Sequence, residues 1–219
     1  MSISPRQQKT EDLLYAAGIL PVVAVDTLDQ ARHVAESLLE GGLPAIELTL
    51  RTPVAMEALE VLKKEYPGVA VGMGTVLTID QIGRCVAAGA DFLVTPGTPA
   101  HMAEALATAP IPVIPGAGTP TELMTLMQHG FRVCKLFPAT AVGGLAMIKG
   151  LYGPIPDLKL CPTGGITEAT VSEYLAQPNV VCAGGSWMVP KAWLEAGEWN
   201  SVRDAAARAA AIVKQARGG

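Results

Sequence analysis

Charged residues are scarce in this 219-residue chain and make up 16% of it, against about 25% in an average globular protein. Disordered chains are polar and highly charged, so a chain that is 50% hydrophobic is expected to fold. The net charge of −4 argues against a nucleic-acid surface, which is normally basic. Long apolar runs are missing too. The run Ile19–Val25 is broken by Pro21 and is far shorter than the roughly 18 residues of a membrane span.

The signatures of several protein classes are also absent. The four cysteines form no C-x-x-C pair, so neither a zinc knuckle nor a redox motif is indicated. The three histidines lie apart from the apolar strands described below, and we expect neither a metal nor a cofactor. No G-x-G-x-x-G follows the first apolar run, and no G-x-S-x-G appears. The polar segment Met1–Glu11 has no hydrophobic signal core, so we expect a cytoplasmic protein.

What the chain does contain is a repeated alternation of two patterns. Short apolar, β-branched runs predict strands buried on both faces. These runs are Ile19–Val25, Ala45–Leu50, Val69–Met73, Phe92–Thr95, Pro112–Ile114, Val133–Phe137, Lys159–Pro162 and Val180–Ala183. Amphipathic stretches between them predict helices, several with a threonine at the start or a glycine at the end. The expected helices include Asp29–Glu40, Pro53–Glu65, Ile79–Ala88, Thr121–His129, Thr167–Leu175 and Val202–Ala216.

Eight strands, each followed by a helix, predict an α/β protein with a closed (β/α)8 TIM barrel. An open doubly wound sheet is the alternative, but it rarely uses eight evenly spaced strands. No linker or shift in composition divides the chain, so we expect one barrel domain over residues 1–219. The segment Ser4–Ala17 predicts an extra N-terminal helix that precedes the barrel.

Lys135 is the sharpest candidate for chemistry, because active sites of such barrels lie at the C-terminal ends of the strands. Of the eight lysines, it alone lies late in a predicted strand, inside the apolar run Val133–Phe137. Burial strips water from an ammonium group and favours the neutral amine, which attacks ketones to form a Schiff base. The alternative is a structural ion pair with a carboxylate inside the barrel.

Glu47 and Arg51 support the first interpretation. Glu47 interrupts the apolar run Pro44–Leu50, where a carboxylate is costly unless it is paired or functional. Facing Lys135 across a barrel, it would add a general acid/base to the nucleophile. Arg51 lies at the rim, where its planar guanidinium suits a substrate carboxylate, although a surface ion pair is the alternative.

Two glycine pairs follow the last two predicted strands, in Cys161–Gly165 (C-P-T-G-G) and Cys182–Ser186 (C-A-G-G-S). Glycine lets main-chain N–H groups approach an anion closely. Phosphate sites in these barrels commonly come from the loops after strands seven and eight. Turns need glycine anyway, but two pairs in consecutive units favour a phosphate site.

The chain resembles the 2-keto-3-deoxy-6-phosphogluconate (KDPG) aldolase family, bacterial Schiff-base aldolases also described as 4-hydroxy-2-oxoglutarate (KHG) aldolases. The resemblance covers essentially the whole chain, and its most specific segments are Ile46–Thr52 (I-E-L-T-L-R-T) and Cys134–Ala139 (C-K-L-F-P-A). The other matching segments are Gly18–Val22, Gly72–Thr75, Val94–Gly97, Val113–Gly116, Pro162–Gly165 and Gly184–Trp187.

The resemblance implies a role for each site residue. Lys135 forms the Schiff base with the C2 ketone, and Glu47 is the general acid/base, acting directly or through a bound water. The implied substrate contacts are Arg51 and Thr75 for the pyruvate carboxylate, Pro96 and Phe137 for the pocket around it, Thr163 for the substrate chain, and Gly164, Gly165, Gly185 and Ser186 for the phosphate.

The resemblance further implies a homotrimer that cleaves a phosphorylated 2-keto-3-deoxy sugar acid to pyruvate and glyceraldehyde 3-phosphate. KHG, cleaved to pyruvate and glyoxylate, is the second candidate substrate. No metal, cofactor, nucleic acid or membrane partner is implied.

Two rival functions fit part of the pattern. A phosphosugar isomerase or epimerase on the same barrel would use Glu47 as its base and Lys135 only electrostatically. A non-catalytic sugar-phosphate sensor would need the glycine loops but not a desolvated lysine beside a carboxylate. Trapping of pyruvate on Lys135 by borohydride separates the three.

Overall fold

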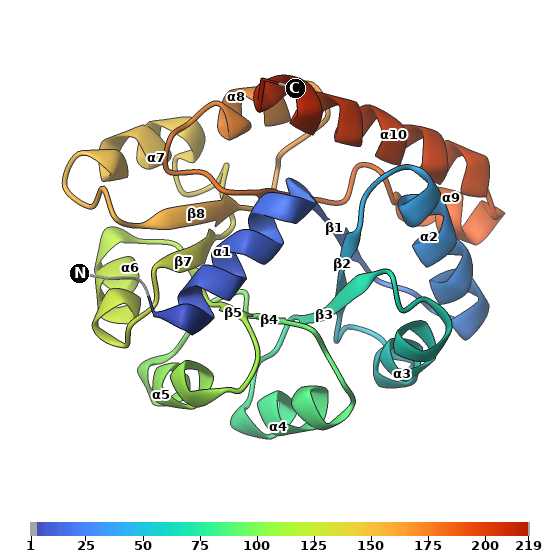
Figure 1. Cartoon of the computed structure of the whole chain (residues 1–219), viewed down its shortest axis with the longest axis horizontal. Coiled ribbons are helices and arrows are strands. Elements are labelled where there is room, and N and C mark those ends of the chain that lie inside the picture. Colours follow the sequence, from blue (N-terminus) through green and yellow to red (C-terminus); the bar gives the residue numbers. More distant parts are fainter. Residues whose placement is uncertain (1–3, 219) are drawn as a thin grey trace.

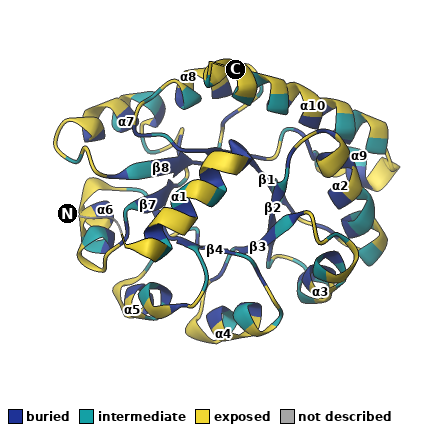
Figure 2. Cartoon of the chain, in the orientation of Figure 1, coloured by how far each residue is buried: buried dark blue, intermediate teal, exposed yellow. Residues whose placement is uncertain are grey.

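The computed structural model describes residues 4–218. Residues 1–3 and 219 of the predicted single domain, and with them the first three residues of Met1–Glu11, lie outside the described residues. The molecule is an α/β fold in which parallel strands form a curled inner layer with helices arranged around it (Figure 1). Figure 2 shows the strands as buried and the outward helix faces as exposed.

The strands belong to two parallel sheets, with the orders β5-β4-β3-β2-β1-β9 and β6-β7-β8. In chain order they are β1 (Ile19–Val23), β2 (Ala45–Thr49), β3 (Ala70–Gly74), β4 (Leu93–Val94), β5 (Val113–Ile114), β6 (Gly116–Ala117), β7 (Val133–Leu136), β8 (Lys159–Pro162) and β9 (Ala183–Gly185). The helices are α1 (Pro5–Ala17), α2 (Leu28–Glu40), α3 (Ala55–Glu65), α4 (Ile79–Ala87), α5 (Ala100–Thr108), α6 (Pro120–Gln128), α7 (Gly144–Tyr152), α8 (Val171–Leu175), α9 (Lys191–Ala196) and α10 (Trp199–Ala216).

The two sheets meet at both of their edges. Strands β5 and β6 flank Pro115, which has no N–H to donate and so interrupts the ladder. Before this break β5 pairs with β4, and after it β6 pairs with β7. At the other edge, isolated bridges join Leu160 to Val180 and Thr163 to Gly184. The segment 113–117 and the end of β8 therefore connect the sheets.

Alternation along the strands separates two groups of side chains, because successive residues of a strand point to opposite faces. The larger hydrophobic cluster packs the strands against the helices. The smaller one, here called the inner cluster, comprises Leu14, Ala17, Leu20, Ala45, Phe92, Val94, Ile114, Val133, Cys161, Val181 and Cys182. Glu47 and Lys135 each follow a member of the inner cluster by two residues, so they point to the same inner side.

Helix α1 confirms the predicted N-terminal helix and covers one end of the inner cluster. Its Leu14 and Ala17 belong to that cluster, and Figure 1 shows the helix lying across the strands. The Gln7 side chain accepts hydrogen bonds from the N–H groups of Arg132 and Val133, at 2.7 and 3.2 Å. Because Val133 is the first residue of β7 and Arg132 precedes it, α1 lies at the amino ends of the strands and leaves the carboxyl ends open.

Three helices begin with the same local pattern of a threonine followed three residues later by Gln or Glu. The side-chain oxygens of Thr27, Thr78 and Thr119 each accept the N–H of that third residue. Such a cap satisfies an N–H group that has no partner within the helix. The pattern fixes where α2, α4 and α6 start, and thus where the preceding loops end.

Several predicted boundaries are wrong. The helix predicted from Pro53 begins at Ala55, because residues 51–54 form turns. The helix predicted from Thr167 begins at Val171, after a turn in which the Thr170 side chain accepts the N–H of Thr167. The last strand is Ala183–Gly185 rather than Val180–Ala183. Gly184 and Gly185, predicted as a turn, pair instead with β1.

Candidate active site

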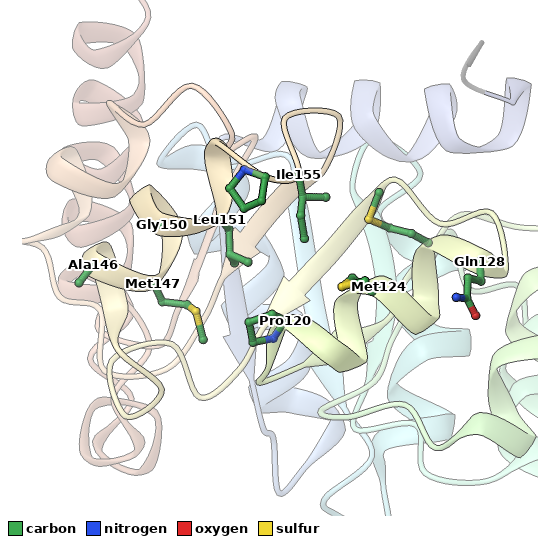
Figure 3. Close-up of a pocket in the computed structure, with 10 residues that line it drawn as sticks. Pro120, Met124, Gln128, Ala146, Met147, Gly150, Leu151 and Ile155 are labelled. Carbon is green, nitrogen blue, oxygen red and sulfur yellow. The ribbon is translucent and has the colours of Figure 1, made fainter.

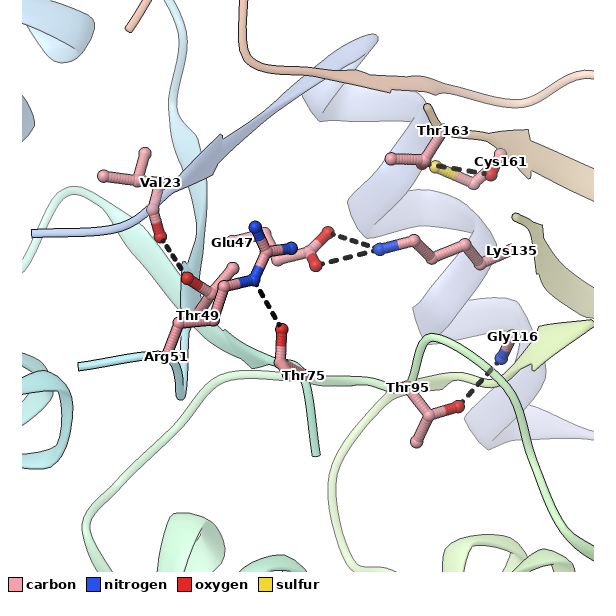
Figure 4. Close-up of polar contacts among 10 residues, drawn as sticks. All are labelled: Val23, Glu47, Thr49, Arg51, Thr75, Thr95, Gly116, Lys135, Cys161 and Thr163. Carbon is pink, nitrogen blue, oxygen red and sulfur yellow. Dashed lines mark hydrogen bonds and ion pairs between the residues drawn. The ribbon is translucent and has the colours of Figure 1, made fainter. Parts of the chain in front are cut away.

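The side chains of Lys135 and Glu47 meet inside the strand layer (Figure 4). The Lys135 Nζ atom donates to Glu47 Oε1 at 2.9 Å and to Oε2 at 3.3 Å. The two side chains are only 5% and 1% exposed. The structure thus brings together the two charged residues that interrupt predicted apolar strands.

The position of Lys135 is fixed by its strand and by the groups around its side chain. Lys135 lies in β7, paired with Gly116 on one side and Cys161 on the other. The Phe137 ring centroid lies 5.2 Å from Lys135 Nζ, within the range of a cation–π contact. The lysine is therefore held by an opposite charge and an aromatic face, with the inner cluster below it.

A buried ion pair is costly to desolvate and is weak evidence for a stabilising role alone. It does offer chemistry here, because the two groups can exchange a proton directly. Transfer of a proton from Lys135 Nζ to Glu47 leaves a neutral amine beside a carboxylic acid. These are the nucleophile and the proton donor needed for addition of an amine to a carbonyl group.

Arg51 and Thr75 form the second polar group of the site. Arg51 follows β2 and is exposed, and its Nε donates to Thr75 Oγ1 at 3.3 Å. Thr75 has a φ of 59° and is the one non-glycine residue with positive φ in the described chain. A β-branched residue is strained in this conformation, and such strain clusters at functional sites. The remaining guanidinium nitrogens of Arg51 can bind a carboxylate.

A cavity of about 240 Å³, here called the glycine cavity, opens at the carboxyl ends of the strands. It is lined by Val22, Arg51, Phe137, Thr163, Gly164, Gly165, Ile166, Gly185 and Ser186. Most of the residues predicted for substrate and phosphate contacts therefore share one space. Sequence reasoning missed Val22 and Ile166, whose only signal is that each lies near the end of a strand.

Main-chain geometry in the glycine cavity suits an anion. Gly164 and Gly165 have positive φ values of 101° and 78°, which favour glycine. A Cβ at Gly165 would overlap the Thr140 side chain. Within residues 4–218, the N–H groups of Gly165 and Ser186 donate to no protein acceptor. Main-chain N–H groups without a protein partner are typical of anion-binding concavities.

Of the predicted site residues, Glu47, Thr75, Pro96 and Lys135 do not line the glycine cavity. Pro96 follows β4 and lines a separate cavity of about 370 Å³ together with Leu77, Gly97 and Glu122. The main chain of Pro96 lies against Gly116, whose N–H is accepted by the Thr95 side chain at 2.8 Å. Pro96 thus supports the strand beside Lys135.

Two other cavities differ in their relation to this site. One, of about 410 Å³, shares Val22, Arg51 and Ser186 with the glycine cavity. The other, about 680 Å³, lies between α6 and α7 and is lined mainly by apolar residues such as Met124 and Met147 (Figure 3). It shares no residue with the glycine cavity, so its size alone does not mark it as the site.

Across residues 4–218, no three His, Cys, Asp or Glu side chains lie close enough together to hold a metal ion. No helix within that range is long and apolar enough to cross a lipid bilayer.

Comparison with known proteins reveals close similarity over nearly the whole chain. Residues 10–205 match the family described as "Aldolase: KDPG and KHG aldolase". The 2-dehydro-3-deoxy-phosphogluconate aldolase of Pseudomonas aeruginosa is 41% identical over 199 residues, covering 90% of each chain. The KHG/KDPG aldolase of Escherichia coli is 40% identical over 192 residues, covering 88% of this chain and 90% of its own.

A solved structure gives the same relationship in three dimensions. The KDPG aldolase of Legionella pneumophila superposes with a TM-score of 0.88 and 39% identity, covering 93% of this chain and 97% of its own. That protein was crystallised with pyruvate captured as a covalent carbinolamine intermediate.

Proposed function

The chain belongs to the KDPG and KHG aldolase family and is an aldolase, a carbon–carbon lyase; we propose that it works through a Schiff base on Lys135. Its substrate is KDPG, which it cleaves to pyruvate and glyceraldehyde 3-phosphate. The observation that carries this proposal is the buried contact of 2.9 Å between Lys135 Nζ and Glu47 Oε1. The covalent pyruvate adduct of the Legionella relative supports it.

Covalent chemistry begins when the neutral Lys135 amine attacks the substrate C2 ketone. A C–N bond forms, the carbonyl oxygen takes up the proton that the attacking nitrogen loses, and a carbinolamine results. Glu47, which holds the proton that the Lys135 ammonium group gave up before the attack, protonates the hydroxyl group, which leaves as water. The iminium that remains withdraws electrons from the neighbouring C3–C4 bond.

Cleavage follows from the same pair of residues. The Glu47 carboxylate takes the proton of the C4 hydroxyl, and the C3–C4 bond breaks. Its electron pair moves into the iminium as an enamine, while glyceraldehyde 3-phosphate leaves. Protonation of C3 and addition of water at C2 then release pyruvate and regenerate the Lys135 amine.

The substrate's two charged ends fit two parts of the site. Arg51 and Thr75 hold the pyruvate carboxylate, and Gly164, Gly165, Gly185 and Ser186 hold the phosphate. Phe137 and Thr163 lie between these ends and contact the substrate chain, an arrangement supported by their common cavity. A role for Pro96 beside the pyruvate stays a prediction, because it lines the neighbouring cavity.

KHG is the second substrate of the same site. It presents the same ketone to Lys135 and the same carboxylate to Arg51, but it leaves the phosphate loops unfilled.

Family membership favours the aldolase over the two rival functions, an isomerase or epimerase and a non-catalytic sensor, because neither of these needs a lysine nucleophile.

The fold and assembly form the rest of the proposal. The nine strands act as one closed eight-stranded barrel in a single domain, with β5 and β6 as one strand; the hydrogen bonds at both sheet edges support this. The barrels associate as a homotrimer, which light scattering would report as about three times the 22.7 kDa chain mass. The cytoplasmic location stays a prediction.

Pyruvate release tests the function directly. Purified protein is given KDPG, and pyruvate is measured with lactate dehydrogenase and NADH. The wild type and Lys149→Ala, which removes an exposed lysine on α7, are expected to turn over alike. Lys135→Ala is expected to lose more than about 10³-fold in kcat. Turnover by Lys135→Ala near the wild-type rate would overturn the assignment of the nucleophile.

A further inference from the structure

Gly74, the last residue of β3, lies directly against the Glu47 side chain. It pairs with Thr49 in β2, and its carbonyl accepts the N–H of Leu50 at 2.9 Å. A Cβ placed on residue 74 would lie 2.6 Å from Glu47 Cγ, 2.8 Å from Cδ and closer still to Oε1. Real Cβ atoms essentially never come within 3.0 Å of another heavy atom. The Glu47 side chain therefore occupies the space that any other residue at position 74 would fill.

The backbone itself does not require glycine at this position. Gly74 is not among the described glycines with positive φ, in contrast to Gly164 and Gly165. An alanine can adopt the conformation of an ordinary strand residue. What position 74 requires is space, and the group that uses this space is the Glu47 side chain.

Glu47 cannot evade such a Cβ by turning its far end. The closest atoms include Cγ, which is attached to the Cβ of Glu47 and moves only if the whole side chain changes rotamer. The oxygen that the Cβ would approach most closely, Oε1, is the one held by Lys135 Nζ at 2.9 Å. A methyl group at 74 would therefore displace the carboxylate oxygen from its partner.

We propose that Gly74 is a positioning residue for the reaction: its missing side chain lets the Glu47 carboxylate lie at hydrogen-bonding distance from Lys135. The inference rests on the proposed function, in which Glu47 moves the protons. According to this inference, the position of the Glu47 carboxylate depends on the neighbouring strand β3 as well as on β2, the strand that carries Glu47. Gly74 itself touches no reacting atom.

Gly74→Ala is expected to lower kcat for KDPG cleavage by about 10²-fold, because displacing a reacting group by about 1 Å can cost this much. KM is expected to change by less than about threefold, since Arg51 and the phosphate loops still bind the substrate. Gly83→Ala is the matched control. It adds the same methyl group on α4, where no heavy atom lies within 4 Å, and kcat is expected to stay unchanged.

A double-mutant cycle with Glu47→Ala separates positioning from a general loss of packing. Glu47→Ala removes the three atoms that a Cβ at 74 would meet, so Gly74→Ala is expected to change kcat less than about twofold in that background. The melting temperature is expected to follow the same pattern. Gly74→Ala lowers it when introduced into the wild type but does not lower it further when introduced into the Glu47→Ala variant. If Glu47→Ala alone does not fold, Glu47→Ala/Lys135→Met removes both charges, and the melting comparison is made there.

Gly72→Ala serves as a second control on the same strand. Its Cβ would overlap the Phe92 ring instead of Glu47, so its effect on melting is expected to be the same with or without Glu47→Ala. The proposal is overturned if Gly74→Ala keeps kcat within twofold of the wild type, or if its cost is equally large beside Glu47→Ala. If Glu47→Ala itself leaves kcat unchanged, the acid/base part of the proposed function fails, while the melting cycle still decides whether Gly74 positions Glu47.

Discussion

The Lys135 Nζ atom lies 2.9 Å from Oε1 of Glu47, a residue 88 positions earlier in the chain. The strands that carry the two residues belong to different sheets, β7 in one and β2 in the other. Each residue follows a member of the inner cluster on its strand, so both charges lie above the same apolar layer. In the proposed function, this contact places the nucleophile beside its proton acceptor.

Glu47→Gln tests proton transfer while keeping the shape of the side chain. The amide still reaches Lys135 but cannot accept its proton, so kcat for KDPG cleavage is expected to fall by about 10²- to 10⁴-fold. Steady-state kinetics measure this, with Glu57→Gln on the exposed face of α3 as control. Equal kcat in the wild type and Glu47→Gln would remove Glu47 from the chemistry.

Arg51→Lys tests the carboxylate clamp. A lysine keeps the charge but loses the planar fork and the bond from Nε to Thr75 Oγ1. KM for KDPG and for KHG is expected to rise about tenfold, because both substrates carry the carboxylate. Arg84→Lys, at an exposed position on α4, is the control. A KM that stays at its wild-type value for both substrates would place the carboxylate elsewhere.

Gly165→Ala tests the phosphate site. The residue has a φ of 78°, and an added Cβ would overlap Thr140, so the loop must shift. The kcat/KM for KDPG is expected to fall at least about tenfold, while that for KHG changes less than about twofold, because only KDPG has a phosphate. Gly150→Ala on α7, with open space around it, is the control. Equal losses for the two substrates would contradict a phosphate role for this loop.

The thiols are expected to be unreactive in the folded protein. All four cysteines are buried, and burial raises the pKa of Cys134 and Cys182 far above the usual value and that of Cys85 to about 11. A raised pKa keeps the thiol protonated at neutral pH, whereas the thiolate is the reactive form. Ellman's reagent at neutral pH should label no thiol in the native protein and four after denaturation. Rapid labelling of the native protein would show that a cysteine is accessible.

Glu122 is expected to make stability depend on acid pH. The Gly118 N–H and the Thr119 hydroxyl donate to its carboxylate and lower its pKa. The contribution of Glu122 to the free energy of unfolding is therefore complete above the pKa that this carboxyl group has in the unfolded chain. It is lost as the pH falls through the lower pKa of the folded state. Glu122→Gln should reduce the urea midpoint at pH 7, and the two proteins should converge as the pH falls through the lowered pKa of Glu122. A difference that does not shrink as the pH falls would contradict this.

The contact between Lys135 and Glu47 was predictable because a charge inside an apolar strand is conspicuous. Lys135 and Glu47 each interrupt such a run, and the period of two along a strand predicts that they face the same side as their apolar neighbours. The family resemblance supplied the roles of Arg51, Thr75 and the glycine loops. Most strands were located to within two residues, because each is marked by a short apolar run in the sequence.

Other features depend on contacts that no local pattern records. The sequence predicts a turn at Gly184 and Gly185 because glycine is typical of turns, yet the two residues lie in β9 and pair with β1. Pro96 follows its strand as expected, but it lines another cavity than the one at the glycine loops. The contact of Gly74 with Glu47 depends on the rotamer of a residue in the neighbouring strand. Tertiary packing decides all three.

Reductive trapping tests the central claim most directly. The protein is incubated with pyruvate, reduced with borohydride, digested and mapped by mass spectrometry, with Lys135→Ala treated in parallel. The account predicts one reduced pyruvyl group per chain, on the peptide that contains Lys135, and none on the variant. An unmodified Lys135 peptide, or a label carried by another lysine, would contradict it.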